Sequence, residues 1–203
     1  GVTLPERVEG RLEFRGPSAT AGYWHAPELT ARLFTDKQGE WLDTGDRAYL
    51  AEGDVFVTGR VKDIVIRGGR NLYPQEIEET VGAVKGVRKG CVAVFGRHDE
   101  RSGTERLVVL AEVSPREGRD TQALRDAVSR AVVAAIGEPA DDILLAPPHT
   151  VLKTSSGKVR RAACRALVEQ GGLNKASKSV RSQWLRLAGG ALGLRRERER
   201  PVR

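Results

Sequence analysis

The sequence has few of the residues from which disulfide-rich and metal-bound domains are built. It contains only two cysteines, Cys91 and Cys164, which lie far apart with no C-x-x-C spacing, and its three histidines are scattered. Neither a disulfide framework nor a metal site is therefore expected. Two free thiols are typical of a cytoplasmic protein, which is the location we predict.

Methionine is absent, and no apolar run is long enough to cross a bilayer. The first ten residues, GVTLPERVEG, lack the basic region and apolar run of a signal peptide. A strand-like pattern begins almost at once. Together with the missing methionine, it suggests a piece of a longer protein. The 203 residues are enough for one or two domains.

The charge is unevenly distributed. The net charge is +7, but residues 150–203 hold 14 of the 34 lysines and arginines and only 3 of the 27 acidic residues. The first 149 residues are therefore mildly acidic. Because the basic residues gather in a loop and a terminal segment and aromatic residues are sparse, a nucleic-acid-binding protein is disfavoured. Salt-sensitive binding to nucleic acid would be its signature.

The first 60 residues predict a compact, mostly β unit. Alternating polar and apolar residues predict strands in RVEGRLEFRG and GDVFVTGR, and a further strand just beyond this unit in KDIVIRGG, residues 62–69. The second of these is entered through the turn Glu52–Gly53. Between the first two strands, a short helix is expected after Pro27.

From Asp63 onwards the pattern changes to α+β. The segment YPQEIEETVGAV predicts a helix with Pro74 in its first turn and an apolar face of Ile77, Val81 and Val84. Short apolar strands are expected in GCVAVFG, RLVVLAEV and DDILLA. Helices are expected in TQALRDAVSRAVVAAIG, which ends at Gly137, and in RRAACRALVEQGG. Helices on a small mixed sheet make a second α+β domain.

The last segment, residues 173–203, allows two interpretations. One is a frayed tail. The other is a basic amphipathic helix around Trp184, Leu185 and Leu187 that lies on a membrane or on another domain.

The segment KTSSGKVRR, residues 153–161, has the composition of a phosphate-binding loop. It is not a P-loop, because Leu152 replaces the first glycine and Val159 replaces the hydroxyl residue after the lysine. A surface turn with a solvated lysine is the simpler alternative.

Three segments, WLDTGDRAYL, VTGRVKDIVIRGGRNLYPQEIE and KTSSGKVRR, occur in this order. Together they resemble the C-terminal part of the adenylate-forming superfamily, which includes acyl-CoA synthetases, fatty acyl-AMP ligases, luciferases and peptide-synthetase adenylation domains. The resemblance covers residues 8–170. It implies that residues 1–61 end a large AMP-binding domain, that 62–172 form a small mobile α+β lid, and that 173–203 are a basic tail.

The resemblance implies a reaction in two steps, in which a carboxylic acid first forms an acyl-adenylate with ATP and the acyl group then passes to an acceptor. Asp46 matches the aspartate that holds the ribose hydroxyls, and Arg60 matches a second nucleotide contact. The simpler alternatives are a turn aspartate after Gly45 and an ordinary arginine at a strand end.

Lys62 matches the hinge about which the lid rotates between the two steps. Gly68 and Gly69 match the place where the chain approaches a pantetheine arm, although a hairpin turn alone would also explain them. Lys158 matches the lysine that reaches the substrate carboxylate and the α-phosphate.

Other residues around that lysine have supporting roles in this interpretation. Thr154, Ser155 and Ser156 are expected to keep the loop polar and flexible. Lys153, Arg160 and Arg161 are expected to be solvated or docking charges.

The implied substrates are ATP with Mg²⁺, a fatty acid, and CoA or a carrier-protein phosphopantetheine as acceptor. RGGRNLYPQEIE resembles fatty acyl-AMP ligases more than acetate-activating enzymes. The phosphate loop and most of the acyl pocket belong to an N-terminal AMP-binding domain absent from this sequence, so the chain alone is expected to be inactive. A non-catalytic lid-type module that docks a carrier protein or another partner is the alternative.

Overall fold

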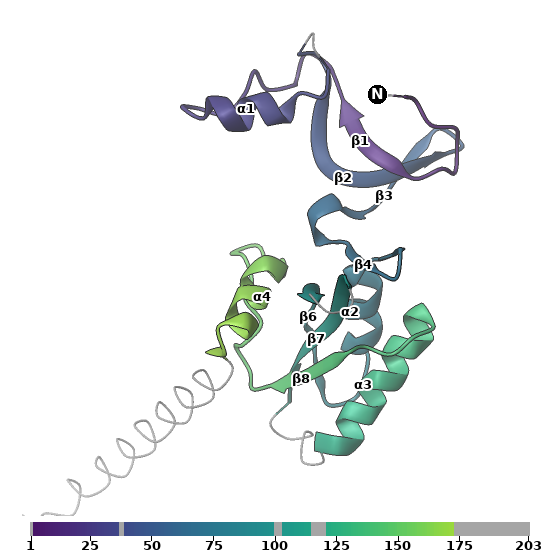
Figure 1. The fold of residues 1–203 in the computed structure, drawn as a ribbon, viewed down its shortest axis with the longest axis vertical. Coiled ribbons are helices and arrows are strands. Elements are labelled where there is room, and N and C mark those ends of the chain that lie inside the picture. Colours follow the sequence, from purple (N-terminus) through teal and green to yellow (C-terminus); the bar gives the residue numbers. More distant parts are fainter. Residues whose placement is uncertain (1, 37–38, 100–102, 115–120, 173–203) are drawn as a thin grey trace, which may run out of the picture. The chain divides into compact units, whose positions relative to one another are not determined.

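The structure, a computed structural model, describes residues 2–36, 39–99, 103–114 and 121–172. The chain divides into two compact units, Gly1–Gln75 and a second unit that begins at Glu76 (Figure 1). Each is described by itself. The predicted tail at 173–203 lies outside the described residues.

The first unit is built on an antiparallel sheet in the order β1-β2-β3, with β1 at Gly10–Phe14, β2 at Leu42–Ala51 and β3 at Asp54–Arg60. Helix α1, Pro27–Leu33, lies between β1 and β2 in the sequence, and Pro27 stands in its first turn. Glu52 and Gly53 have φ values of 55° and 85°, which is the conformation of a tight two-residue hairpin. The predicted strands, helix and turn of this region are confirmed.

The chain then turns through a short 3₁₀ helix, η1 at Val61–Asp63, in which the Ile64 N–H donates to the Arg60 carbonyl at 3.3 Å. A small hairpin follows, formed by β4 at Val65–Arg67 and β5 at Arg70–Leu72. The expected strand over KDIVIRGG is therefore shorter than predicted, because its first residues form the 3₁₀ turn and its two glycines form the hairpin turn.

The second unit contains a three-stranded sheet in the order β6-β7-β8, formed by Val87–Asp99, Thr104–Val113 and Asp142–Ala146. Strands β6 and β7 are antiparallel, whereas β8 runs parallel to β7. Parallel neighbours need a crossover connection, and it includes α3, Thr121–Ile136. Helix α2 is Pro74–Gly82 and α4 is Arg161–Glu169. The predicted helices and strands are thus confirmed.

Both faces of this sheet are covered, which explains why its strands show little polar alternation. On one face, Cys164 of α4 packs with Ala93, Phe95, Val108 and Leu110. Helices α2 and α3 lie on the other face (Figure 1). Their buried side chains are Ile77, Val81, Leu124, Val128 and Val132. A β-rich first unit and an α+β second unit confirm the predicted fold class.

The border between the compact units falls after Gln75, in the first turn of α2. The predicted domain border lies earlier, at Lys62, in the 3₁₀ turn of the first unit. The hinge at Lys62 stays a prediction. Among the described residues, no helix combines the length and the hydropathy needed to cross a membrane.

Candidate functional site

Asp46 lies in β2, and the three residues before it in the same motif determine the local backbone. Asp43 accepts a hydrogen bond from the Gly45 N–H at 2.8 Å and forms an ion pair with Arg11 at 2.7 Å. The Thr44 hydroxyl accepts from the Asp46 N–H at 3.1 Å and donates to the Leu12 carbonyl at 2.9 Å. Gly45 has a φ of 74°, which a glycine adopts without strain. These contacts set the backbone that presents Asp46.

Asp46 and Arg60 are register partners on β2 and β3. Arg60 Nε donates to Asp46 Oδ1 at 3.1 Å, and the side chains are 53% and 28% exposed. The register shifts immediately afterwards, between Arg47 and Ala48. Asp46 is therefore part of the ladder directly after the turn at Gly45, and Arg60 is the last residue of β3, as the simpler alternative for it expects. The structure brings together two predicted nucleotide-binding residues from separate motifs.

A cluster of hydrogen bonds around the partly buried Glu9 was not foreseen from the sequence. Glu9 accepts from Arg47 Nε at 2.8 Å, from the Thr58 hydroxyl, and from the Tyr73 hydroxyl at 2.5 and 2.6 Å. Burial alone would raise the pKa of Glu9, but the hydrogen bonds from Thr58, Tyr73 and Arg47 lower it below the usual value. Burial, and then the bond to Glu9, raise the pKa of Tyr73.

Lys62 is exposed in the 3₁₀ turn that follows β3. A short turn between two strands is a place where backbone angles can change, which is what a hinge requires.

Gly68 and Gly69 form the turn of the β4–β5 hairpin, with φ values of 54° and 78°. A Cβ atom on either residue would meet no heavy atom within 4 Å. The simpler interpretation, a glycine hairpin turn, is therefore correct as geometry. It leaves an exposed, side-chain-free surface, which the predicted pantetheine path also requires.

Lys158 lies at the end of a closed turn in the second unit. The Thr154 N–H donates to the Lys158 carbonyl at 2.9 Å, and the Lys158 N–H donates to the Thr154 hydroxyl at 3.0 Å. Lys153 and Val159 form a β-bridge across the base of the turn. Thr154 therefore closes the turn in addition to keeping it polar. The Lys158 side chain is exposed.

The structure corrects the prediction made for Arg161. Expected to be a solvated or docking charge, it instead forms a two-fold ion pair with Glu78 of α2, at 2.8 and 2.7 Å, and both side chains are only 13% exposed. Glu78 also accepts from the Val94 N–H of β6 at 3.0 Å. The pair joins α4, which follows the lysine turn, to α2 and to the edge of the sheet.

A second buried carboxylate supports the start of the same turn. Glu112 of β7, 1% exposed, accepts from the Val151 N–H at 2.8 Å and from Arg88 at 2.5 Å. At the base of the turn, Lys153 Nζ lies 3.3 Å from the sulfur of Cys91. Both cysteines are free and buried, and burial raises the pKa of the Cys164 thiol.

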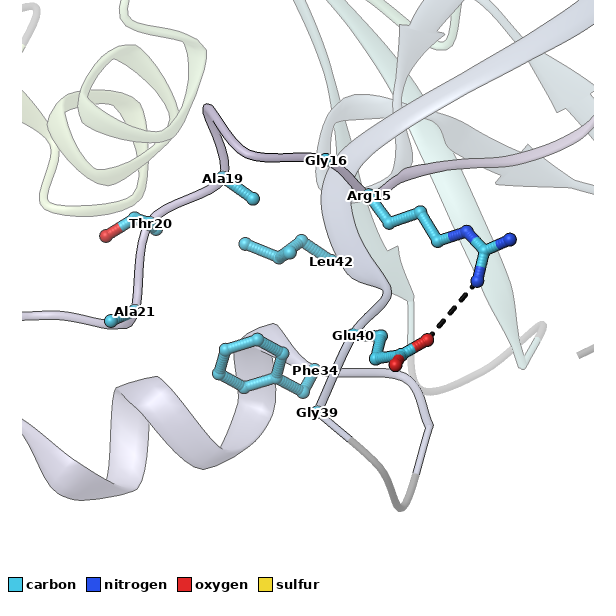
Figure 2. A pocket seen from close by; sticks show the side chains of 9 residues that line it. All are labelled: Arg15, Gly16, Ala19, Thr20, Ala21, Phe34, Gly39, Glu40 and Leu42. Atoms are coloured by element: carbon cyan, nitrogen blue, oxygen red, sulfur yellow. Dashed lines mark hydrogen bonds and ion pairs between the residues drawn. The ribbon is translucent and has the colours of Figure 1, made fainter.

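A cavity of about 560 Å³ lies in the first unit, between the segment after β1 and the start of β2 (Figure 2). Phe34 and Leu42 supply apolar lining, and the Arg15–Glu40 ion pair, at 3.2 Å, lies at one side. No predicted site residue lines this cavity. Within the described ranges, no group of three His, Cys, Asp or Glu side chains could hold a metal ion.

The predicted residues thus occupy two places. Asp46, Arg60, Lys62, Gly68 and Gly69 belong to the first unit, and Lys158 belongs to the second. Four residues with paired side chains were not foreseen from the sequence: Glu9, Tyr73, Glu78 and Glu112. Of these, only Tyr73 and Glu78 lie inside a quoted motif, and nothing in the local pattern pairs them with distant partners.

No protein-family model matches the chain. Among curated proteins, it is 39% identical over 178 residues to a protein named fatty-acid–CoA ligase FadD21 of Mycobacterium leprae, covering 80% of this chain and 30% of that protein. It is 33% identical over 194 residues to the long-chain-fatty-acid–AMP ligase FadD26 of Mycobacterium marinum, covering 88% and 32%. The chain therefore spans about a third of the length of these relatives.

Comparison with solved structures points to the same group of proteins. The chain matches a structure of McyG A-PCP complexed with phenylalanyl-adenylate with a TM-score of 0.74 and 30% identity, over 90% of this chain and 32% of that one. It matches a fatty acyl-adenylate ligase from a study of the E. coli and L. pneumophila enzymes with a TM-score of 0.66 and 29% identity, over 90% and 30%. In sequence and in fold, the chain belongs to the adenylate-forming, AMP-binding family of the fatty-acid ligase type and corresponds to its C-terminal part.

Proposed function

We propose that the protein to which this chain belongs is an ATP-dependent acyl-activating ligase. It joins a fatty acid to AMP as an acyl-adenylate and then transfers the acyl group to a pantetheine thiol. The observation that carries the proposal is the Asp46–Arg60 pair, in which an acceptor and a donor from two motifs meet on adjacent strands at 3.1 Å. The likeness to ligases and to an adenylate complex supports it.

In this proposal, Asp46 and Arg60 make separate hydrogen bonds to the nucleotide. The bond from Arg60 Nε engages one carboxylate oxygen, Oδ1, so Oδ2 can accept hydrogen bonds from the ribose hydroxyls. Arg60 retains its terminal amino groups as further donors in a fixed fork. Mutual pairing holds both side chains in place before the nucleotide arrives, which lowers the entropy cost of binding.

Lys158 acts in the first step. A carboxylate oxygen of the fatty acid attacks the α-phosphorus of ATP, the bond from phosphorus to the bridging oxygen breaks, and pyrophosphate leaves with the electron pair. Negative charge grows on the α-phosphate oxygens, and a positioned ammonium group stabilises it. The closed turn at 153–159 supports this role, since it presents an exposed lysine from a constrained backbone. ATP enters as its magnesium complex.

The second step uses the glycine turn. A thiolate attacks the acyl carbonyl carbon, the bond from carbon to the AMP oxygen breaks, and AMP leaves. The open surface at Gly68 and Gly69 supports a path for the pantetheine arm, because no side chain narrows it. CoA and a carrier protein carry the same arm, and the resemblance of RGGRNLYPQEIE to fatty acyl-AMP ligases favours the carrier protein.

An N-terminal AMP-binding domain completes the enzyme in this proposal, with the phosphate loop and the acyl pocket. Large apolar side chains of the first unit support it, because they are exposed here, among them Trp24 at 89%, Val57 at 59% and Phe56 at 45%. A domain packed against the first unit would remove such side chains from water, which is favourable. The chain alone is then inactive.

The test uses the full-length protein, a panel of fatty acids, and the fatty-acid-dependent exchange of pyrophosphate into ATP. Exchange should require both the acid and Asp46, and Asp46→Ala should abolish most of it. Glu40→Gln, which opens an exposed ion pair elsewhere in the first unit, should leave it intact. Binding of a carrier protein without any exchange would contradict the proposal and favour a docking module without catalysis.

A further inference from the structure

Tyr73 connects the segment after β3 to the sheet of the first unit. Its hydroxyl donates to both carboxylate oxygens of Glu9, at 2.5 and 2.6 Å. Glu9 immediately precedes β1, and it is held in turn by Arg47 of β2 and Thr58 of β3. A single carboxylate therefore joins Tyr73 to all three strands of the sheet.

The ring of Tyr73 lies close to the same sheet. A Cβ atom built on Gly59 would come within 3.3 Å of Tyr73 Cδ1 and 3.8 Å of Cε1. Gly59 is the residue before Arg60, so the glycine of the TGR motif leaves room for this ring. The contact is therefore a packed aromatic ring as well as a hydrogen bond.

The position of Tyr73 along the chain gives the contact its significance. The residues between Arg60 and Tyr73 include the exposed turn with Lys62 and the hairpin with Gly68 and Gly69. Tyr73 stands at the end of this segment, and the compact first unit ends just beyond it, at Gln75. The contact between Tyr73 and Glu9 explains why residues 61–73 belong to the first unit, although they follow the predicted hinge at Lys62.

We propose that Tyr73 and Glu9 form a latch that fastens residues 61–73 to the first unit. While the latch is closed, a change of direction between the units is confined to the residues after Tyr73. When the latch opens, residues 61–73 are released from the sheet. The backbone can then change direction as early as Lys62. That such a change separates the two half-reactions rests on the proposed function, but the latch is a property of this chain without substrates.

The latch has a defined pH dependence. The groups that face Glu9 are the Arg47 guanidinium, the Thr58 hydroxyl and the Tyr73 hydroxyl. Because its folded-state pKa is lowered, Glu9 contributes stability that is present above its unfolded value and is lost as the pH falls through the lowered one. The Tyr73 pKa is raised, so its contribution is complete below about pH 10, the ordinary value. The latch is therefore strongest at neutral pH and weakens in acid.

The test measures amide hydrogen-exchange protection factors in the 203-residue chain at neutral pH. Tyr73→Phe removes the hydroxyl and keeps the ring. Protection of the β4–β5 hairpin should fall roughly tenfold, the scale of one hydrogen bond to a charged group, while β6 and β7 stay unchanged. Tyr49→Phe, which removes a hydroxyl from a ring stacked on Phe56 of the same sheet, should alter neither region.

A second measurement separates the latch from a general structural role. In the wild-type chain, hairpin protection should drop as the pH is lowered past the titration of Glu9, while β6 and β7 remain protected. Glu9→Gln keeps one acceptor oxygen but cannot titrate, so it should show an intermediate loss and no such step.

Two results would overturn the latch: wild-type hairpin protection in Tyr73→Phe, or an equal loss of protection throughout both units. Neither depends on catalysis. A full-length protein without exchange activity would therefore defeat the proposed function and leave the latch measurement intact.

Discussion

Asp46 and Arg60 lie opposite each other on β2 and β3, fourteen residues apart in sequence, with Arg60 Nε 3.1 Å from Asp46 Oδ1. Because the arginine is about half exposed, the pair should contribute only about 0–1 kcal/mol to stability. Its importance is expected in nucleotide binding.

The first prediction concerns this pair. In the full-length enzyme, Asp46→Asn should raise the KM for ATP roughly tenfold or more, the scale of a lost hydrogen bond to a charged group. The unfolding free energy should change by less than about 1 kcal/mol. Steady-state kinetics and urea unfolding check the two parts. An unchanged KM for ATP, with stability lost instead, would show that the pair is only structural.

The second prediction concerns Lys158. Lys158→Ala should reduce pyrophosphate exchange by about a hundredfold or more, the scale of losing one charge contact in the transition state. Acyl transfer from supplied acyl-adenylate should be affected much less. The thermal midpoint should not change, since the side chain is exposed. Lys85→Ala removes another exposed lysine of the second unit and serves as the control. Equal losses in both half-reactions would contradict the assignment.

The third prediction concerns Gly69. Gly69→Leu should leave acyl-adenylate formation intact and block transfer to both CoA and a phosphopantetheinylated carrier protein. Leucine at a φ of 78° also adds backbone strain, about 1–2 kcal/mol. Gly53→Leu controls for this strain, because Gly53 occupies another hairpin turn of the first unit, with a φ of 85° and equally open space around it. Transfer at the wild-type rate in Gly69→Leu would rule out a pantetheine path there.

The fourth prediction concerns Glu78 and Arg161. Replacing one partner leaves a largely buried charge unpaired, which costs up to about 3–5 kcal/mol. Arg161→Ala should therefore lower the stability of the second unit strongly, whereas Arg160→Ala, at an exposed neighbour, should change it by less than about 0.5 kcal/mol. Denaturant unfolding of the 203-residue chain measures both. Similar small effects would show that the ion pair contributes little.

Periodicity in the sequence was sufficient to predict most helices and strands. The apolar stripe of α3 and the uninterrupted apolar runs of β6 and β7 follow from burial, which selects the same residues that form the pattern. The helix α2 begins at Pro74 as predicted, because proline suits a first turn. The segment 62–69 was predicted less well. A hairpin of two three-residue strands is too short to establish a clear period.

For the candidate site too, some properties follow from the sequence and others only from the tertiary structure. The sequence alone determined which residues carry charge, hydroxyl groups or no side chain, and hence the motif resemblance of Asp46, Arg60 and Lys158. Only the tertiary structure decided their partners. Asp46 meets Arg60 because an irregularity between Arg47 and Ala48 shifts by one residue the register that the Glu52–Gly53 turn begins. Arg161 is a structural cation because folding brings Glu78 beside it, and Glu9 meets Tyr73 across 64 residues. Such pairings depend on contacts between distant segments, which the local pattern around either residue does not contain.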